Sequence, residues 1–327
     1  MKETVVKVEE LKKWFPVTTG FFSTILSRKQ LFVRAVDEVS FEIRRGEIFG
    51  LAGESGSGKT TTGRLILKLI EPSGGKIYFE GKDITTFSAK ELKRIRRKMQ
   101  IIFQDPYESL NPRMTISNIV AEPLTVQGLG SEAENRVRKV LEDVELIPAE
   151  EFLHRFPHEL SGGQRQRVAV ARALVLDPEF MVADEPVSML DVSIRAEVLN
   201  LMLNLVKKFD LSLLYITHDL ALARHMCDRI AIMYLGKIME IASAEKIVYE
   251  PLHPYTKALI LAVPVPDPTS DRSELVIKGE IPSPVNPPPG CRFHTRCPVM
   301  IGEICRTKEP PLIEVGDEHY VACHLHT

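Results

Sequence analysis

The sequence predicts an α/β fold with a helical insertion and a separate, loop-rich C-terminal region. An apolar strand at 48–52 leads directly into a glycine-rich loop and then a helix. From residue 89 to 159 the pattern is mostly helical, and after Pro251 prolines crowd the chain. Because a strand, a glycine loop and a helix in succession are typical of a helix-covered parallel sheet, we expect one such core followed by a second region.

The elements follow in order along the chain. Strands are expected at 5–8, 35–43, 48–52 and 76–79, a first helix at 61–70, and amphipathic helices at 91–98 and 132–144. The 55 residues between Gln104 and Leu160 form a helical insertion, after which strand, helix and strand continue through Met239. We therefore expect a first domain over 1–250, with a helical subdomain at about 105–160, and a C-terminal extension over 251–327.

The glycine-rich loop fits the pattern G-x-x-x-x-G-K-[ST] at every specified position. Its residues, with the first residue of the expected helix, are Gly53, Glu54, Ser55, Gly56, Ser57, Gly58, Lys59, Thr60 and Thr61. Glycines let the backbone curl around phosphates with its N–H groups pointing inward. Lys59 is expected to reach the β- and γ-phosphates, and the Thr60 hydroxyl to bind Mg²⁺. The loop predicts binding of ATP or GTP.

A second phosphate-binding turn precedes another helical stretch, at 166–176. It consists of Leu160, Ser161, Gly162, Gly163 and Gln164. A glycine turn at a helix N-terminus presents free N–H groups and a partial positive charge, which suits a γ-phosphate. One nucleotide cannot easily use both turns of one chain, so we expect a dimer in which each chain's second turn closes the other's nucleotide site.

This second turn is identical to the signature of the ABC ATPases, and other motifs of that family follow in order. Asp184 and Glu185, after the apolar run 180–183, resemble the Walker B carboxylate that holds Mg²⁺ and the adjacent base that orients water. Gln104 resembles the Q-loop glutamine, which also serves the Mg²⁺ and water site. Asp191 matches the D-loop, although Met189 departs from the usual alanine, and His218 matches the switch histidine.

The resemblance also implies an aromatic ring that stacks on the adenine after the first strand. Phe15 has the expected spacing, whereas Trp14 is the only tryptophan of the chain, and the sequence leaves both open. The following segment, 17–29, contains Phe21 and Phe22 and is expected to be a surface hairpin.

Composition limits the function classes. Apolar residues make up 44% and charged residues 26% of the 327 residues, as in globular proteins that are soluble in water. The net charge of −2 does not indicate a nucleic-acid or anionic-lipid surface. No apolar run of 18 residues occurs and the N-terminus does not resemble a signal peptide, so we expect neither secretion nor a membrane span. Work at a membrane would need a partner there.

Four of the five cysteines lie in the proline-rich region: Cys291, Cys297, Cys305 and Cys323. Such a region should have little core of its own and needs a staple. Disulfides are not expected in an ATP-binding chain without a signal peptide, so a metal site is favoured. Four thiolates hold either Zn²⁺ or an iron–sulfur cluster, and the chemistry alone does not choose. Cys227 is expected to be a small buried residue.

The C-terminal region resembles the extension of oligopeptide and dipeptide importer ATPases. The resemblance rests on the runs 253–256, 279–284 and 290–298. Because some members carry a [4Fe-4S] cluster on four such cysteines, it implies that cluster rather than zinc. The fold implied is a P-loop ABC nucleotide-binding domain, with a RecA-like core, an antiparallel β subdomain and a helical subdomain, plus a metal-stapled extension.

Within that group the chain looks like the F-type ATPase subunit. The resemblance implies a D-type ATPase subunit as heterodimer partner, two transmembrane permeases, an extracytoplasmic substrate-binding protein, and a peripheral position at the cytoplasmic face of the cell membrane. ATP-driven closure of the dimer would power import of peptides. Relatives also import oligosaccharides or nickel. A soluble ABC ATPase without permease, or an iron–sulfur redox sensor, remains the alternative of another class.

Overall fold

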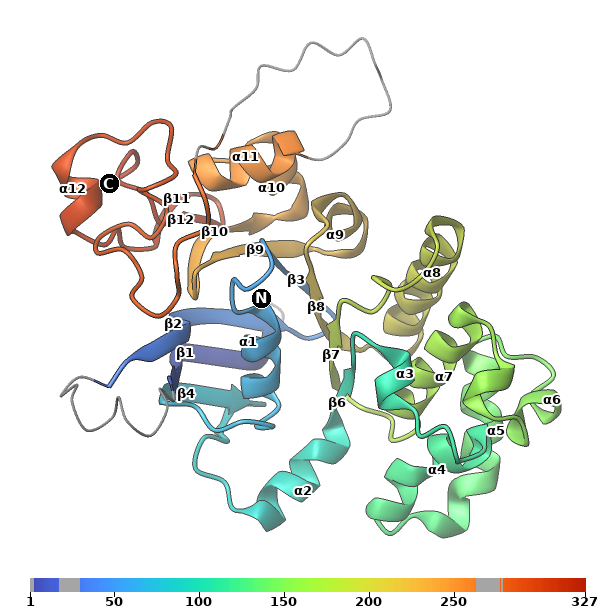
Figure 1. The fold of residues 1–327 in the computed structure, drawn as a ribbon. Coiled ribbons are helices and arrows are strands. Elements are labelled where there is room, and N and C mark those ends of the chain that lie inside the picture. Colours follow the sequence, from blue (N-terminus) through green and yellow to red (C-terminus); the bar gives the residue numbers. More distant parts are fainter. Residues whose placement is uncertain (1–2, 18–29, 263–276, 278) are drawn as a thin grey trace, which may run out of the picture. The chain divides into compact units, whose positions relative to one another are not determined.

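The computed structural model describes residues 3–17, 30–262, 277 and 279–327 (Figure 1). The expected hairpin around Phe21 and Phe22 lies outside these residues. The chain divides into two compact units. Unit 1 comprises Met1–Val6, Ile43–Ile48 and Phe79–Ile216, and unit 2 comprises Lys7–Glu42, Phe49–Tyr78 and Thr217–Thr327.

Unit 1 contains three neighbouring parallel strands. They are β6 (Met99–Ile102), β7 (Phe180–Asp184) and β8 (Ser212–Thr217). The register pairs Met99 with Phe180 and Phe180 with Ser212. Every residue of β7 and β8 is buried, as expected for parallel strands covered on both faces. This arrangement places the carboxylates that end β7 at the carboxyl edge of the sheet.

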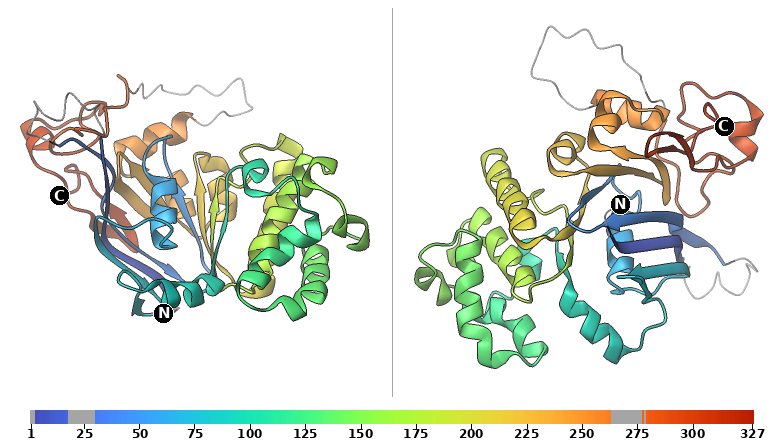
Figure 2. Two further views of the ribbon diagram at one scale, coloured as in Figure 1. Left: turned by 60° about the horizontal axis from the view of Figure 1, so that its bottom comes forward. Right: turned by 180° about the vertical axis from the view of Figure 1, so that it is seen from behind.

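The helices expected between Gln104 and Leu160 are present in unit 1. The helices of this unit are α2 (Ala89–Lys98), α3 (Pro106–Ser109), α4 (Ile116–Val126), α5 (Ala133–Asp143), α6 (Glu150–Leu153), α7 (Gly162–Leu174) and α8 (Val192–Phe209), with short 3₁₀ turns at Gly130–Glu132 and Pro157–Glu159. Helices α4, α5 and α7 lie against one another (Figures 1 and 2). Apolar side chains of these helices, such as Val120 and Leu141, are buried. None of the helices in the described ranges is long and apolar enough to span a bilayer.

The described residues of unit 2 form two groups of strands and five helices. The first group has the order β2 (Phe32–Arg44), β1 (Thr4–Pro16), β4 (Gly74–Phe79). In the second group β3 (Ile48–Ala52) runs parallel to β9 (Arg229–Tyr234), and β9 is followed by antiparallel β10 (Lys237–Ser243), β12 (His319–Val321) and β11 (Ile313–Gly316). The helices are α1 (Lys59–Ile66), α9 (Leu220–Met226), α10 (Ala244–Tyr249), α11 (Pro254–Ala262) and α12 (Glu303–Thr307).

Several element boundaries differ from the sequence expectation. Strands β1 and β2 each have 13 residues and extend beyond the expected ranges 5–8 and 35–43. Helix α1 ends at Ile66 rather than near residue 70, and Lys68 just after it adopts a left-handed backbone with φ of 49°. In β1 the apolar stretch marked only residues 5–8, because the part beyond it carries charged residues such as Lys12, which pairs with Glu38 of β2.

The C-terminal region has more structure than its prolines indicate. Residues 279–302 form neither helix nor strand, as the prolines predict. However, β12 pairs with β10, with Val321 opposite Glu240. The rings of Tyr234, Tyr255 and Phe293 form a buried cluster with centroids 4.7–5.4 Å apart. The expectation of a region with little core, held by a metal, is therefore not supported: strand pairing and aromatic burial already attach it.

A buried carboxylate also joins the C-terminal region to β10. Glu240 is fully buried and accepts hydrogen bonds from the backbone N–H groups of Leu252 at 2.8 Å and His253 at 3.0 Å. Nε2 of His319 lies 2.7 Å from its carboxylate. Burial raises the pKa of Glu240, but the hydrogen bonds from His319 and the backbone outweigh burial and leave that pKa below its ordinary value. Glu240 thus ties the start of α11 and β12 to one strand.

We expect Glu240→Gln to lower the free energy of unfolding by about 1–3 kcal/mol at pH 7, because one buried donor loses its acceptor. A lowered pKa in the folded state means that the carboxylate stabilises the fold above its unfolded pKa of about 4.3, and that this contribution is lost as pH falls through the folded value. The variant should therefore show a flatter loss of stability in acid. Denaturant unfolding between pH 3 and 7 checks this, with exposed Glu250→Gln as control; equal curves for both variants would contradict it.

Candidate functional site

The glycine-rich loop between β3 and α1 has the strained backbone that its sequence predicts. Gly58 has a φ of 107°, and a Cβ there would lie 2.1 Å from the carbonyl oxygen of Ala35. Lys59 is almost fully buried, and its Nζ donates to the carbonyl oxygens of Gly53 at 2.8 Å and Glu54 at 3.0 Å. The loop is thus a tightly curled backbone with a lysine held against it.

The carboxyl edge of the unit 1 strands brings two of the predicted residues together. Glu185 follows β7 with a left-handed backbone, φ 45°, and its N–H donates to the carbonyl of Ile216 at 3.0 Å. Nε2 of Gln104 donates to Oε2 of Glu185 at 3.2 Å. Asp184, the last residue of β7, is buried. An amide, a partly exposed carboxylate and a buried carboxylate therefore share one edge.

The second glycine turn forms the start of α7, a helix of 13 residues. Ser161 caps the helix, because its Oγ accepts from the Gln164 N–H at 3.2 Å and the Gln164 Oε1 accepts from the Ser161 N–H at 3.0 Å. A Cβ on Gly163 would lie 2.7 Å from Cγ2 of Ile194 on α8. Glycine is thus required here for packing of α7 against α8, in addition to any approach of a phosphate.

The loop before α8 is held in place and yet presents apolar side chains. Nε of Arg195 donates to the Leu190 carbonyl at 2.7 Å. Met189 and Val192, on either side of exposed Asp191, are 61% and 80% exposed. Exposed apolar residues on an ordered loop favour a contact with another protein surface.

His218 is exposed and lies in unit 2, between the end of β8 and α9. The following residue, Asp219, caps α9 by accepting from the N–H groups of Ala221 at 2.9 Å and Leu222 at 3.2 Å. The cap fixes where the helix begins and therefore where the histidine backbone sits.

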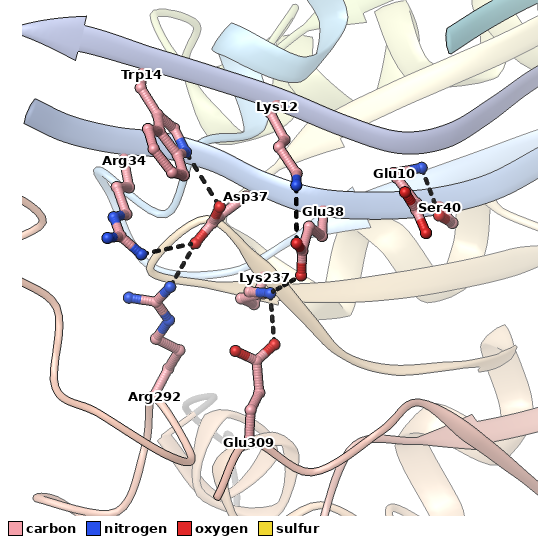
Figure 3. A network of polar contacts seen from close by, with 10 residues as sticks. All are labelled: Glu10, Lys12, Trp14, Arg34, Asp37, Glu38, Ser40, Lys237, Arg292 and Glu309. Carbon is pink, nitrogen blue, oxygen red and sulfur yellow. Dashed lines mark hydrogen bonds and ion pairs between the residues drawn. The ribbon is translucent and has the colours of Figure 1, made fainter. Parts of the chain in front are cut away.

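The two aromatic residues considered for adenine differ in their surroundings. Nε1 of Trp14 donates to Asp37 at 3.0 Å, and the Arg34 guanidinium lies 4.6 Å from the centre of the Trp14 ring. Figure 3 shows the Trp14 indole beside Asp37 and Arg34, at one end of this polar network. Phe15 is 38% exposed and has only the Lys13 ammonium, 5.0 Å from its ring centre, as a described ring contact.

The four C-terminal cysteines line one small pocket, together with His253, His294 and His324. Burial raises the pKa of the Cys291 thiol to about 12, although the Phe293 N–H donates to it. Across the described ranges, however, no group of three or more His, Cys, Asp or Glu side chains is arranged to hold a metal ion. The expected [4Fe-4S] or zinc site is therefore not supported by the geometry. Cys227 is buried beside Gly50, as expected.

Sequence reasoning missed two neighbours of the glycine-rich loop. Tyr255 and Arg296, from the C-terminal region, both contact Glu54. The motif marks Glu54 only as a variable position, and no local signal links it to residues 201 and 242 positions away.

Comparison with family models matches residues 36–188 to the ABC transporter family and residues 239–305 to the C-terminal region of oligopeptide/dipeptide transporters. A putative peptide import ATP-binding protein of Brucella ovis is 55% identical over 293 residues, 89% of this chain and 92% of that protein. The oligopeptide transport ATP-binding protein AppF of Bacillus subtilis is 47% identical over 331 residues, 100% and 98% of the two chains.

Solved structures agree with these relatives. CbiO1 from Clostridium perfringens, part of the ABC transporter complex CbiONQ, has a TM-score of 0.64 at 26% identity, over 76% of this chain and 92% of its own. The ATP-binding cassette MJ0796, solved as a dimer bound to ADP and phosphate, has a TM-score of 0.62 at 30% identity, over 73% and 98%. The chain therefore belongs to the ATP-binding proteins of the ABC transporter family, in the branch that carries the oligopeptide/dipeptide transporter C-terminal region.

Proposed function

We propose that this chain is the ATP-hydrolysing subunit of an importer of peptides. The observation that carries the ATPase part is the contact of Gln104 with Glu185 beside buried Asp184, at the edge where β7 ends. A carboxylate that is positioned by an amide and partly exposed suits the orientation of an attacking water. The peptide part rests on the C-terminal region and on the relatives, which are named as peptide and oligopeptide transport proteins.

We assign the nucleotide's phosphates to the loop 53–61 and to Lys59. Hydroxyl, amide and carboxylate oxygens suit Mg²⁺, so Thr60, Gln104 and Asp184 are the residues that would hold it, where it would neutralise phosphate charge. Glu185 is the proposed base, and His218 the residue that contacts the γ-phosphate. Phe15 is the proposed adenine platform, because its ring is exposed whereas that of Trp14 is covered by Arg34.

We propose that two such cassettes close on each other. Ser161, Gly162, Gly163 and Gln164, at the start of α7, would complete the partner's nucleotide site, and Asp191 would cross the interface. The exposed side chains of Met189 and Val192 support this role, because a contact with a partner would bury them. The dimeric form of the related cassette MJ0796 agrees. The partner is proposed to be a D-type ATPase subunit, with this chain as the F-type subunit.

The proposed assembly also contains two transmembrane permeases and an extracytoplasmic substrate-binding protein. The chain would sit peripherally at the cytoplasmic face of the cell membrane, held by the permeases. In this proposal residues 1–250 form the ATPase domain, with its helical subdomain at about 105–160, and residues 251–327 form the extension.

We also propose that Cys291, Cys297, Cys305 and Cys323 take up a metal, as a [4Fe-4S] cluster or as Zn²⁺. All four thiols line one pocket, and soft thiolate donors suit either group. Backbone N–H groups of Phe293, Val299 and Leu325 donate to three of the sulfurs and would stabilise thiolates there. Because no three of the described His, Cys, Asp or Glu side chains form a group that could hold a metal ion, binding would have to draw the thiols together.

We expect Glu185→Gln to bind ATP normally and to lower kcat at least about 100-fold, because it removes the general base. The variant should also accumulate as a closed dimer with ATP, visible by light scattering. Exposed Glu197→Gln on α8 is the matched control and should hydrolyse ATP at the parental rate. Parental turnover by Glu185→Gln would reject Glu185 as the base.

Peptide import is tested in the native cells, after the gene for this chain is deleted and then restored as the parental or a variant form. Uptake of a labelled peptide should require the chain, be lost in Glu185→Gln and persist in Glu197→Gln, since only the first change stops hydrolysis. The permeases should co-purify with the chain. Uptake of oligosaccharide or nickel but not peptide would contradict the substrate class, and absence of any permease would contradict transport.

Anaerobically purified protein should contain about four iron and four sulfide per chain and absorb visible light, if the group is a [4Fe-4S] cluster. Cys305→Ser should lose both, whereas Cys227→Ala, a buried cysteine outside the pocket, should keep them. Stoichiometric zinc without a chromophore would reject the cluster, and protein without metal would reject both.

A further inference from the structure

The loop that carries the first two C-terminal cysteines reaches the phosphate-binding loop. Nη1 of Arg296 lies 2.8 Å from Oε2 of Glu54, and Nη2 lies 3.1 Å from Oε1. Two parallel hydrogen bonds of this kind fix the orientation of both groups. The side chain of Arg296 is 9% exposed and that of Glu54 24%, so the pair is screened less than a surface pair.

The backbone of Glu54 is held by the same region. Its N–H donates to the hydroxyl oxygen of Tyr255 at 3.0 Å. Tyr255 is fully buried against Tyr234 and Phe293, which leaves its ring little freedom. Nη1 of Arg296 also lies 3.4 Å from the Tyr234 hydroxyl. The C-terminal region therefore binds both the side chain and the backbone N–H of Glu54.

Glu54 in turn sets the position of the lysine that serves the phosphates. Its carbonyl oxygen accepts from Nζ of Lys59 at 3.0 Å and from the N–H of Ser57 at 3.2 Å. Fixing the Glu54 peptide therefore fixes the turn from Glu54 to Ser57 and the position of the Lys59 ammonium group. A change at Arg296 would reach Lys59 through a single residue.

The other end of the same C-terminal loop is anchored independently. Nη2 of Arg292 lies 2.5 Å from Oδ2 of Asp37, the carboxylate that also accepts from Trp14 (Figure 3). Both groups of the Arg292–Asp37 pair are buried. Because Arg292 pairs with Asp37 of β2 and Arg296 pairs with Glu54 of the phosphate-binding loop, residues 292–296 connect these two parts of unit 2.

We propose that Arg296 is a positioning residue for the phosphate-binding loop, and that the C-terminal extension sets the affinity for ATP through Glu54. The inference rests on the proposed ATPase function. The C-terminal extension holds the phosphate-binding loop in its curled form before ATP binds, so that less of the loop must become ordered on binding.

The test compares Arg296→Gln, Arg296→Lys, Glu54→Gln and the double variant Arg296→Gln with Glu54→Gln. We expect Arg296→Gln to raise the dissociation constant and KM for ATP about fivefold to tenfold, the size expected for loss of one partly buried ion pair. At saturating ATP, kcat should stay within about twofold, because no group at the reacting atoms changes. Arg296→Lys, which keeps the charge but not the two-pronged contact, should recover part of the affinity.

The double variant decides whether Arg296 acts through Glu54. We expect it to bind ATP no more weakly than the worse of the two single variants, since both remove the same contact. Glu309→Gln is the control, because Glu309 also pairs the C-terminal region with the core, at Lys237, away from the loop (Figure 3). It should lower thermal stability at most and leave ATP affinity at the parental value.

Parental ATP affinity in Arg296→Gln, additive losses in the double variant, or an equal loss in Glu309→Gln would each overturn the inference and leave Arg296 a structural anchor only. These outcomes differ from failure of the proposed function, in which the parental protein itself would neither bind nor hydrolyse ATP.

Discussion

The backbone of the phosphate-binding loop must stay curled with its N–H groups inward, and much of unit 2 is arranged around this constraint. A Cβ on Gly53 would lie 2.2 Å from the carbonyl oxygen of Met233, and one on Gly58 would lie 2.1 Å from that of Ala35. The loop is thus enclosed by the backbones of β2 and β9, and the Gly236 N–H donates to the Ser57 carbonyl at 2.9 Å. Glycines permit this close approach, and the neighbouring strands prevent the loop from unwinding.

The surface proposed to contact the partner's nucleotide includes exposed residues such as Ser161 and Asp191, whereas the phosphate-binding loop is enclosed by neighbouring strands. The start of α7 and the loop before α8 are ordered by local contacts, the Ser161–Gln164 capping box and Arg195, while their outward groups remain exposed. Such surfaces can contact a partner reversibly, because they are ordered whether or not the partner is bound. Because both protein surfaces are already ordered, closing them on a nucleotide would cost little conformational entropy of the protein, which suits the proposed cycle of closing and reopening.

The C-terminal region gains its order from unit 2 rather than from a core of its own. Glu240 accepts hydrogen bonds from the residues just before α11 and from His319 of β12, and the rings of Tyr234, Tyr255 and Phe293 pack together. Arg292 and Arg296 extend the attachment to β2 and to the phosphate-binding loop. Buried ion pairs add little net stability when both partners lose water, but they fix geometry. Because Arg296 pairs with Glu54 of the phosphate-binding loop, the effect of this pair on the shape of that loop matters more than its effect on stability.

By itself the sequence determined the features that depend on neighbouring residues: the strand at 48–52 with its glycine loop and the helix that follows, the carboxylates at the end of β7, the helices between Gln104 and Leu160, and the glycine turn ahead of α7. Each is encoded by local periodicity or glycine placement. Only the tertiary structure decided the full length of β1 and β2, the pairing of β12 with β10, the hydrogen bond of Trp14 to Asp37 and the ion pair of Arg296 with Glu54. These depend on contacts between residues as many as 242 positions apart, which no local pattern records.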